Sequence, residues 1–310
     1  MGVGLLTSSS HRASPIVSRM PDPTLSPRVR LHEWGTPRAN RALLVLLHGL
    51  TDSGPCWADA VARWAPAYQV IAWDARGHGE SPRFSPGELE TGVGLTHLAD
   101  AVAMLEGLAE RGLPRPILVG HSMGGGTAAA VCASRPDLVR AAVLEDPALG
   151  FFRREARLGA DSVKQDRIDE ARRVRVDLDG AIRQGRLDFP GWPACEIAPW
   201  ALAKAQTDVA MLEDDLITVP WPWREVTRGI AVPTLLVTGD HEVIFDPDLV
   251  METESGDGSA GSLVQVIGQV PLRRIVSIHV DGLEAAPDDE LLWYDVTEFD
   301  TVAGLAHRAS

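Results

Sequence analysis

The chain has 310 residues, and its 45% hydrophobic and 23% charged residues fall in the ordinary range of globular proteins, which excludes a fibrous or largely disordered architecture. The 43 acidic residues outnumber the 29 basic ones and give a formal net charge of −14, which argues against nucleic acid or an anionic membrane as a partner. We therefore expect a neutral or cationic small molecule as the partner. Because no apolar run approaches the roughly 18 residues that span a bilayer, we also expect a cytoplasmic protein.

The cysteines and the N-terminal segment indicate neither a metal site nor secretion. Cys56, Cys132 and Cys195 are too few and too dispersed for a disulfide framework and lack the spacing of metal ligands. Residues 1–27 are rich in Ser, Pro and Arg and contain no convincing signal-peptide core, so we expect a flexible extension. Met20 is an alternative start, because the residues after it lead directly into the first expected strand.

Residues 28–147 alternate short apolar runs with helical stretches, which is typical of a parallel sheet with crossover helices. This pattern predicts the first part of an α/β core. The expected strands are 28–34 at an edge, 42–49, 68–74, 115–120 and 139–147, and the expected helices are 56–65, 95–110 and 124–136.

The regular alternation stops over residues 148–230, where charged helical sequence is followed by Pro and Trp. Four of the nine tryptophans lie there: Trp192, Trp200, Trp221 and Trp223. They suit either core packing or a helical lid that lines an apolar pocket, and we expect a lid. The core should resume over 231–310, with strands at 232–240 and 273–282, a loop at 251–262 and an atypical C-terminal tail.

The clearest chemical signal is a G-x-S-x-G motif between an apolar strand and a helix of small residues. Gly120, Ser122 and Gly124 form it, and this context predicts a sharp strand-to-helix turn that presents the serine as a nucleophile. The backbone N–H groups at the start of the helix should stabilise an oxyanion. The turn after the strand at 42–49 should bring a second N–H group nearby, so we expect Leu50 and Met123 to form an oxyanion hole.

These motifs resemble the α/β-hydrolase superfamily, in the branch of esterases and non-haem chloroperoxidase-like hydrolases. The resemblance covers about residues 28–247, and its motifs are His48-Gly49, Asp74-x-Arg76-Gly77-His78-Gly79, Gly120-x-Ser122-x-Gly124 and LLVTGDHE at 235–242. It implies a mostly parallel sheet flanked by helices, and cofactor-free hydrolysis of a carboxylic ester or related acyl compound through an acyl-enzyme. We expect Asp74, Arg76 and His78 to hold their loop together rather than to react.

The resemblance also implies an acid and a histidine that follow the serine in the chain. The family's usual acid position, three residues beyond a glycine, is Glu242 here, while Asp240 lies one residue beyond that glycine and Asp146 follows the preceding strand. In the family the histidine comes after the last strand, but this chain reads Leu-Glu-Ala-Ala-Pro at 283–287.

Three histidines remain as candidates for the base. We rank His279, within the last expected strand, ahead of His241 and His307. Without a base the serine would be a poor nucleophile, so the alternative function is a catalytically weak binding or sensing protein. A further alternative is an altered reading frame after about Asp248. The sequence indicates no oligomeric state.

Overall fold

The computed structural model describes residues 29–35, 41–149, 157–213 and 217–237, together with the two short strands β7 (Gln265–Val266) and β8 (Ile278–His279). Six strands form the main sheet: β1 (Leu31–Trp34), β2 (Leu43–Leu47), β3 (Gln69–Trp73), β4 (Ile117–His121), β5 (Ala141–Glu145) and β6 (Thr234–Val237). β4 extends one residue beyond the range expected from the sequence, to His121, and each of the other five strands falls within its expected range.

The strands lie in the order β1-β3-β2-β4-β5-β6. β1 is an edge strand that runs antiparallel to β3, and the other neighbouring pairs are parallel. The expected α/β-hydrolase fold, with a mostly parallel sheet flanked by helices, is therefore confirmed.

The continuous apolar sequence of β2 is explained by burial on both faces of the sheet. Leu43, Val45 and Leu47 point into the larger core cluster, whereas Leu44 and Leu46 point into the cluster on the other face. Because side chains alternate across a strand, only a strand covered on both sides keeps every position apolar.

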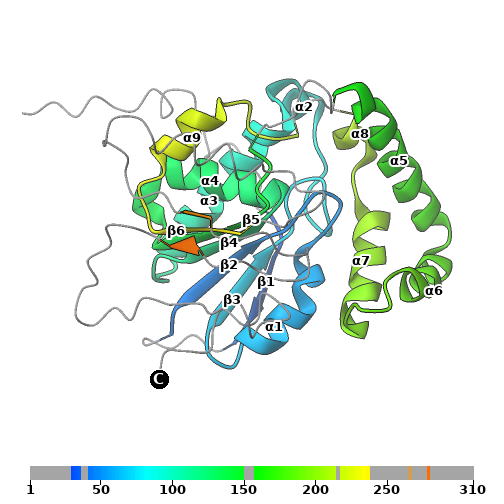
Figure 1. Cartoon of the computed structure of the whole chain (residues 1–310), viewed down its shortest axis with the longest axis horizontal. Helices are drawn as coiled ribbons and strands as arrows, with labels where there is room; N and C mark the ends of the chain where they lie inside the picture. The colour runs from blue at the N-terminus through cyan, green and yellow to red at the C-terminus, as the bar shows by residue number, and fades with distance from the viewer. Residues whose placement is uncertain are drawn as a thin grey trace, which may run out of the picture.

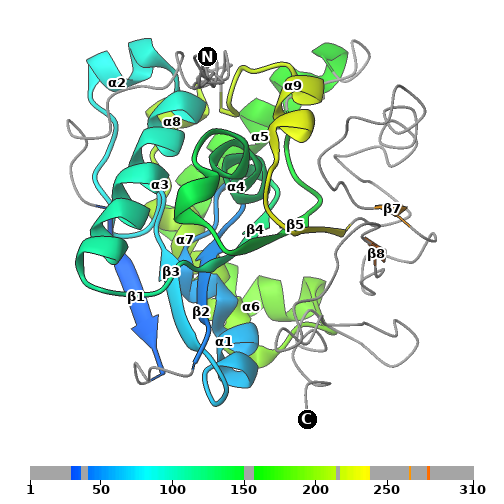
Figure 2. The same cartoon turned by 90° about the vertical axis from the view of Figure 1, so that its left-hand side faces the viewer.

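Helices cover the two faces. α1 (Ala58–Trp64) packs on one face, preceded by the 3-10 turn η3 (Gly54–Trp57), and α3 (Val93–Glu110), α4 (Met123–Ser134) and α9 (Trp223–Gly229) lie on the other (Figure 1). Figure 2 shows α4 between α3 and α9, its neighbours in the packing. Every residue of α4 is buried, and its Gly and Ala residues allow the helix to lie close to the sheet.

The segment between β5 and β6 contains helices and no strand among its described residues. They are α5 (Arg157–Val176), α6 (Leu178–Asp188), α7 (Ala194–Gln206), α8 (Val209–Leu212) and α9. We call α5 to α8 the helical insertion; it stands to one side of the sheet in Figure 1. α7 packs against η3 and α1, close to the carboxyl end of β2, whereas α9 packs against α4 and so joins the core layer.

Smaller elements complete the described chain. α2 (Pro86–Thr91) precedes α3, and the 3-10 turn η4 (Pro136–Leu138) follows α4. β8 lies within the strand expected at 273–282, but it pairs antiparallel with β7 in a separate two-stranded sheet.

Candidate functional site

Three neighbouring strands end at the same level of the sheet. In the parallel register Leu47 of β2 lies opposite Gly120 of β4, and His121 of β4 lies opposite Glu145 of β5. The loops that follow these strands therefore meet at one edge, and in open α/β sheets this carboxyl edge is where ligands bind.

Ser122 lies in the turn between β4 and α4, with φ 49° and ψ −114°. Residues with a Cβ atom rarely adopt this backbone conformation, and it persists only where the surroundings enforce it. Three hydrogen bonds do so: the Ser122 N–H donates to Glu145 O at 2.9 Å, and Ser122 O accepts from the N–H groups of Gly126 and Ala148, each at 2.9 Å. The serine thus lies in the sharp strand-to-helix turn that the motif predicts, and its catalytic role is a proposal taken up below.

The glycines of the motif are required by close backbone packing. A Cβ on Gly124 would overlap the carbonyl groups of Leu47 and His48, and a Cβ on Gly120 would overlap the carbonyl of Gly124. The Gly124 N–H donates to His48 O at 3.1 Å, which joins the start of α4 to the loop after β2. The glycines therefore allow the turn at Ser122 and the loop after β2 to touch.

The backbone N–H groups of Leu50 and Met123 donate no hydrogen bond within the described part of the chain. Met123 is the first residue of α4, where helical N–H groups have no partner in the helix. The Leu50 N–H belongs to the planar trans peptide whose carbonyl is Gly49 O, so the two groups point in opposite directions. Both N–H groups therefore remain free to bind a ligand oxygen.

Gly49 O is fixed by two donors. The Asp52 N–H reaches it at 3.2 Å and closes a turn over Gly49–Asp52, in which Thr51 has a φ of 66°. The second donor is the His48 ring, whose Nδ1 lies 2.8 Å from Gly49 O. The ring must donate there, because its Nε2 accepts the Ala75 N–H at 3.0 Å. These bonds set the direction of the Leu50 N–H.

Three buried histidines hold the loops of the site and stay neutral. Burial lowers the pKa of His48 to about 4, and it lowers the pKa values of His78 and His97 as well. His78 Nε2 accepts the Thr51 N–H at 3.3 Å, and its Nδ1 donates to Arg76 O at 3.1 Å. A neutral ring can accept and donate at once, which is what these positions require.

The loop at 74–81 has the supporting role expected of it. Asp74 accepts from the backbone N–H groups of Gly54 and Glu80, both at 2.8 Å. Arg76 is fully buried and makes two hydrogen bonds of 2.9 Å to Asp100. Burial opposes the ionised form of Asp74, but the hydrogen bonds it accepts lower its pKa overall.

A charged group beside the site was not anticipated from the sequence. Lys204 of α7 is buried, with 8% of its surface exposed, and its Nζ donates to Thr51 Oγ1 at 3.2 Å. It also pairs with Glu170 of α5 at 3.3 Å. Burial raises the pKa of nearby Asp52, against the opposing effect of Lys204. No local motif marks Lys204, because its contact with Thr51 spans 153 positions of the chain.

The expected acid and base are placed only in part. Asp240, Glu242, His241 and His307 lie outside the described residues. His279 lies in β8, where its backbone pairs with Gln265. Asp146 is buried at the end of β5, and its N–H donates to Val237 O at 2.7 Å. Among the side chains that the structure describes, none is hydrogen-bonded to the Ser122 hydroxyl.

Two other features, a metal site and a membrane-spanning helix, are not found among the described residues. No group of three or more His, Cys, Asp or Glu side chains within them has the arrangement of a metal site. No helix in this part of the chain is both long enough and apolar enough to cross a bilayer.

Known proteins resemble the chain over the same core. Residues 42–181 match a family model described as the alpha/beta hydrolase fold. Lipase LipV of Mycobacterium tuberculosis is 31% identical over 221 residues, which cover 66% of this chain and 74% of that protein. A 2-(acetamidomethylene)succinate hydrolase of Mesorhizobium japonicum is 29% identical over 234 residues, covering 68% of this chain and 75% of that protein.

A solved structure agrees with these sequence matches. The crystal structure of E-2-(acetamidomethylene)succinate hydrolase superposes with a TM-score of 0.57 at 21% identity, covering 78% of this chain and 86% of that one. At that identity the likeness concerns the fold, whereas the lipase match extends to sequence over most of both proteins. The chain therefore belongs to the α/β-hydrolase family.

Proposed function

We propose that the chain hydrolyses a carboxylic ester or a related acyl small molecule, without a cofactor, through an acyl-enzyme on Ser122. The observation that carries this proposal is the strained position of Ser122 between β4 and α4. Beside it lie two backbone N–H groups without a partner in the described part of the chain, those of Leu50 in the loop after β2 and of Met123 at the start of α4. A passive serine would not need a turn that three hydrogen bonds must enforce.

The reaction would proceed in two balanced halves. A base takes the Ser122 hydroxyl proton while Oγ attacks the ester carbonyl carbon, and the resulting oxyanion accepts hydrogen bonds from the Leu50 and Met123 N–H groups. The proton then passes to the leaving alcohol as the carbon–oxygen bond breaks. Water attacks the acyl-enzyme in the same manner and releases the acid.

The base and its acid come from the resemblance to the family. We assign the base to His279 and its orienting acid to Glu242 or Asp240. In such a triad the acid fixes the tautomer and orientation of the imidazole, while the imidazole carries the proton.

The substrate class is supported by the names of two relatives and by the helical insertion. The relatives are called a lipase and a 2-(acetamidomethylene)succinate hydrolase, and both names denote hydrolysis of a small molecule. We propose that the insertion acts as a lid that selects the substrate, because α7 packs against η3 near the carboxyl end of β2. The excess of acidic residues favours a neutral or cationic substrate. We propose the cytoplasm as the compartment.

A second candidate function is a hydrolase-like binding or sensing protein that has lost its base. It is favoured by the sequence at 283–287, which holds no histidine where the family has one. Loss of a triad member leaves only the contribution of the oxyanion hole and binding.

Labelling with a fluorophosphonate probe separates the two functions, because the probe reacts with an activated serine hydroxyl. If the chain is an esterase, we expect fast labelling of the unmodified chain and none of Ser122→Ala. If the unmodified chain is labelled fast and His279→Ala is not labelled, His279 is the base. If His279→Ala is still labelled fast, the base is His241 or His307. Slow labelling of the unmodified chain that Ala285→His accelerates by roughly 10⁴-fold would establish the lost base instead.

A further inference from the structure

Lys204 is an unusual residue for the inner side of a helical insertion. Lysine is rarely buried unless its ammonium group is paired, yet only 8% of the Lys204 surface is exposed. Its partners are the Glu170 carboxylate at 3.3 Å, the Trp200 ring at 5.2 Å from the ring centroid, and Thr51 Oγ1 at 3.2 Å. The first two belong to the insertion and hold the ammonium group in place, while the third belongs to the core.

Thr51 is one of three non-glycine residues with positive φ among those the structure describes. With a φ of 66° it occupies the third position of the turn over Gly49–Asp52, where glycine or asparagine is usual. A β-branched residue adopts this conformation only when its surroundings enforce it. Here the His78 ring holds the Thr51 N–H from the core, and Lys204 holds the hydroxyl from the insertion.

The geometry of this turn extends to the Leu50 N–H. The conformation of Thr51 decides where the Asp52 N–H points, and that N–H donates to Gly49 O at 3.2 Å. Gly49 O and the Leu50 N–H are the two ends of one planar peptide, so fixing the carbonyl fixes the N–H. A contact that fixes Thr51 therefore also fixes the proposed oxyanion donor, through the Asp52 N–H and the peptide between Gly49 and Leu50.

We propose that Lys204 is a positioning residue that couples the helical insertion to the turn over Gly49–Asp52. When α7 packs on the core, the Lys204 ammonium group fixes Thr51 and so directs the Leu50 N–H toward the reacting carbonyl. This inference rests on the proposed function, because it needs Leu50 as an oxyanion donor. Lys204 itself does not touch the substrate. Its effect should appear in the chemical step, since oxyanion stabilisation is stronger in the transition state than in the bound substrate.

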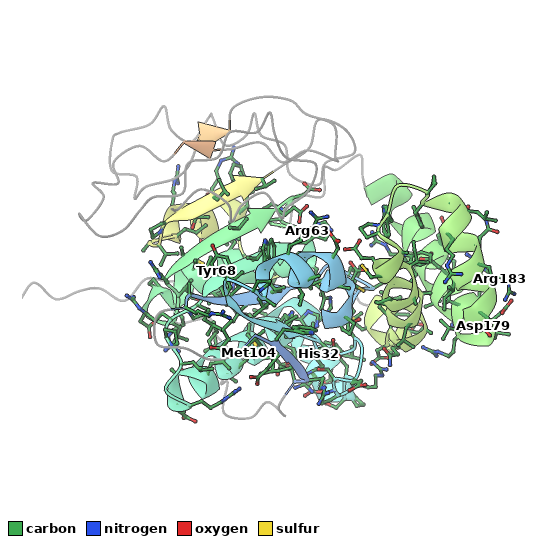
Figure 3. All side chains as sticks on the ribbon, turned by 90° about the horizontal axis from the view of Figure 1, so that it is seen from below. His32, Arg63, Tyr68, Met104, Asp179 and Arg183 are labelled. Atoms are coloured by element: carbon green, nitrogen blue, oxygen red, sulfur yellow. The ribbon has the colours of Figure 1, made fainter. Side chains whose placement is uncertain are left out.

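The experiment compares Lys204→Met, Lys204→Arg and Thr51→Val in the full-length protein. Thr51→Val keeps the branched shape and removes only the acceptor. Arg183→Met is the matched control, because Arg183 is an exposed cation on the outer side of α6, away from the sheet (Figure 3). Two substrates are used: 4-nitrophenyl acetate, which is neutral, and mono-4-nitrophenyl glutarate, which carries a carboxylate.

For Lys204→Met and Thr51→Val we expect kcat to fall about tenfold on both substrates with KM within about twofold, as removal of a contact made only in the transition state requires. The double variant should lose no more than either single one, because both changes break one contact. Lys204→Arg should recover part of the loss, and Arg183→Met should match the unmodified chain. A rise in KM confined to the glutarate ester would overturn the proposal, since Lys204 would then bind the substrate carboxylate.

Hydrogen–deuterium exchange of peptides covering residues 48–54 gives a readout that does not need turnover. Exchange there should be faster in Lys204→Met than in the unmodified chain and unchanged in Arg183→Met. Equal exchange in all three proteins would refute the coupling. If fluorophosphonate does not label even the unmodified chain, the proposed function fails, while the exchange result still decides whether the insertion holds the loop.

Discussion

Replacement of Ser122 by glycine should stabilise the fold while it removes the proposed nucleophile. The φ of 49° and ψ of −114° place Ser122 in a region that is costly for any residue with a Cβ atom, by roughly 1–3 kcal/mol. Glycine has no Cβ and reaches such conformations without this cost. The fold should therefore gain stability when the Cβ of residue 122 is removed, whereas glycine at a position without strain would lower stability.

The magnitude follows from two opposing effects. Relief of strain should contribute about 2 kcal/mol, the middle of the usual range. Glycine also has more freedom in the unfolded chain, which offsets about 0.7 kcal/mol of that gain. The net stabilisation is therefore about 1 kcal/mol relative to alanine, which should raise Tm by about 2 °C in a chain of this size.

Ser122→Ala is the reference for this comparison, because it also loses the hydroxyl but keeps the Cβ. Differential scanning calorimetry of the two variants measures the relief of strain less the entropic cost of glycine. Ala62→Gly on the exposed side of α1 is the control, and it should lower stability by about 1 kcal/mol, as glycine does within a helix. If Ser122→Gly melts no higher than Ser122→Ala, the turn is not strained and the reasoning is wrong.

Three further predictions concern the scaffold around the site, and urea denaturation monitored by circular dichroism tests each. Gly124→Ala should destabilise the protein by about 3 kcal/mol or more, because the added Cβ overlaps the end of β2. Gly107→Ala in α3 is the control: its Cβ meets open space, so it should stabilise the protein by about 1 kcal/mol. Similar effects of the two substitutions would contradict the packing argument. The His48 ring has a pKa of about 4 in the folded protein and of 6.5 in the unfolded chain. Between these pH values the unfolded state binds more protons than the folded state. The free energy of unfolding should therefore fall by about 3 kcal/mol from pH 6.5 to pH 4. A His48→Gln variant should lack this part of the pH dependence, and an identical slope would show that other groups cause it. Asp100→Asn removes the fully buried one of the two carboxylates that pair with the Arg76 guanidinium and leaves Glu88 at 3.0 Å, so it should cost about 3 kcal/mol, the lower end for a broken buried pair. A loss below 1 kcal/mol would mean that the Arg76–Asp100 pair is not effectively buried.

Elements that depend on residues close together in the sequence could be predicted well. β2 is recognisable because a short run of five apolar residues that ends before a His-Gly turn is typical of a strand buried on both faces. The turn at Ser122 is recognisable because its two glycines and flanking elements lie within one short stretch. The helix α2 also carries a local signal, a capping box from Ser85 to Glu88 with Pro86 between them.

Features that depend on distant residues could not be predicted in this way. The left-handed Thr51 carries no mark in the sequence, because neither glycine nor asparagine stands there. Its partner Lys204 sits in a helix far along the chain, and nothing in the local pattern distinguishes it from a surface lysine. Such contacts follow from how the insertion packs on the core, which periodicity alone does not specify.

The way the chain leaves and re-enters the sheet makes the helical insertion exchangeable. β5 and β6 are hydrogen-bonded neighbours, and the Asp146 N–H reaches Val237 O at 2.7 Å, so the two ends of the intervening segment are joined by the ladder itself. The entropy of closing a connection grows slowly with its length, by about 0.6 kcal/mol per doubling. Shorter, longer or unrelated segments could therefore be grafted between these strands, provided that they supply a helix on α4 and a donor for Thr51. Because we propose that the insertion selects the substrate, we expect that recombination at this junction can change the substrate preference while the strands on either side of Ser122 remain unaltered.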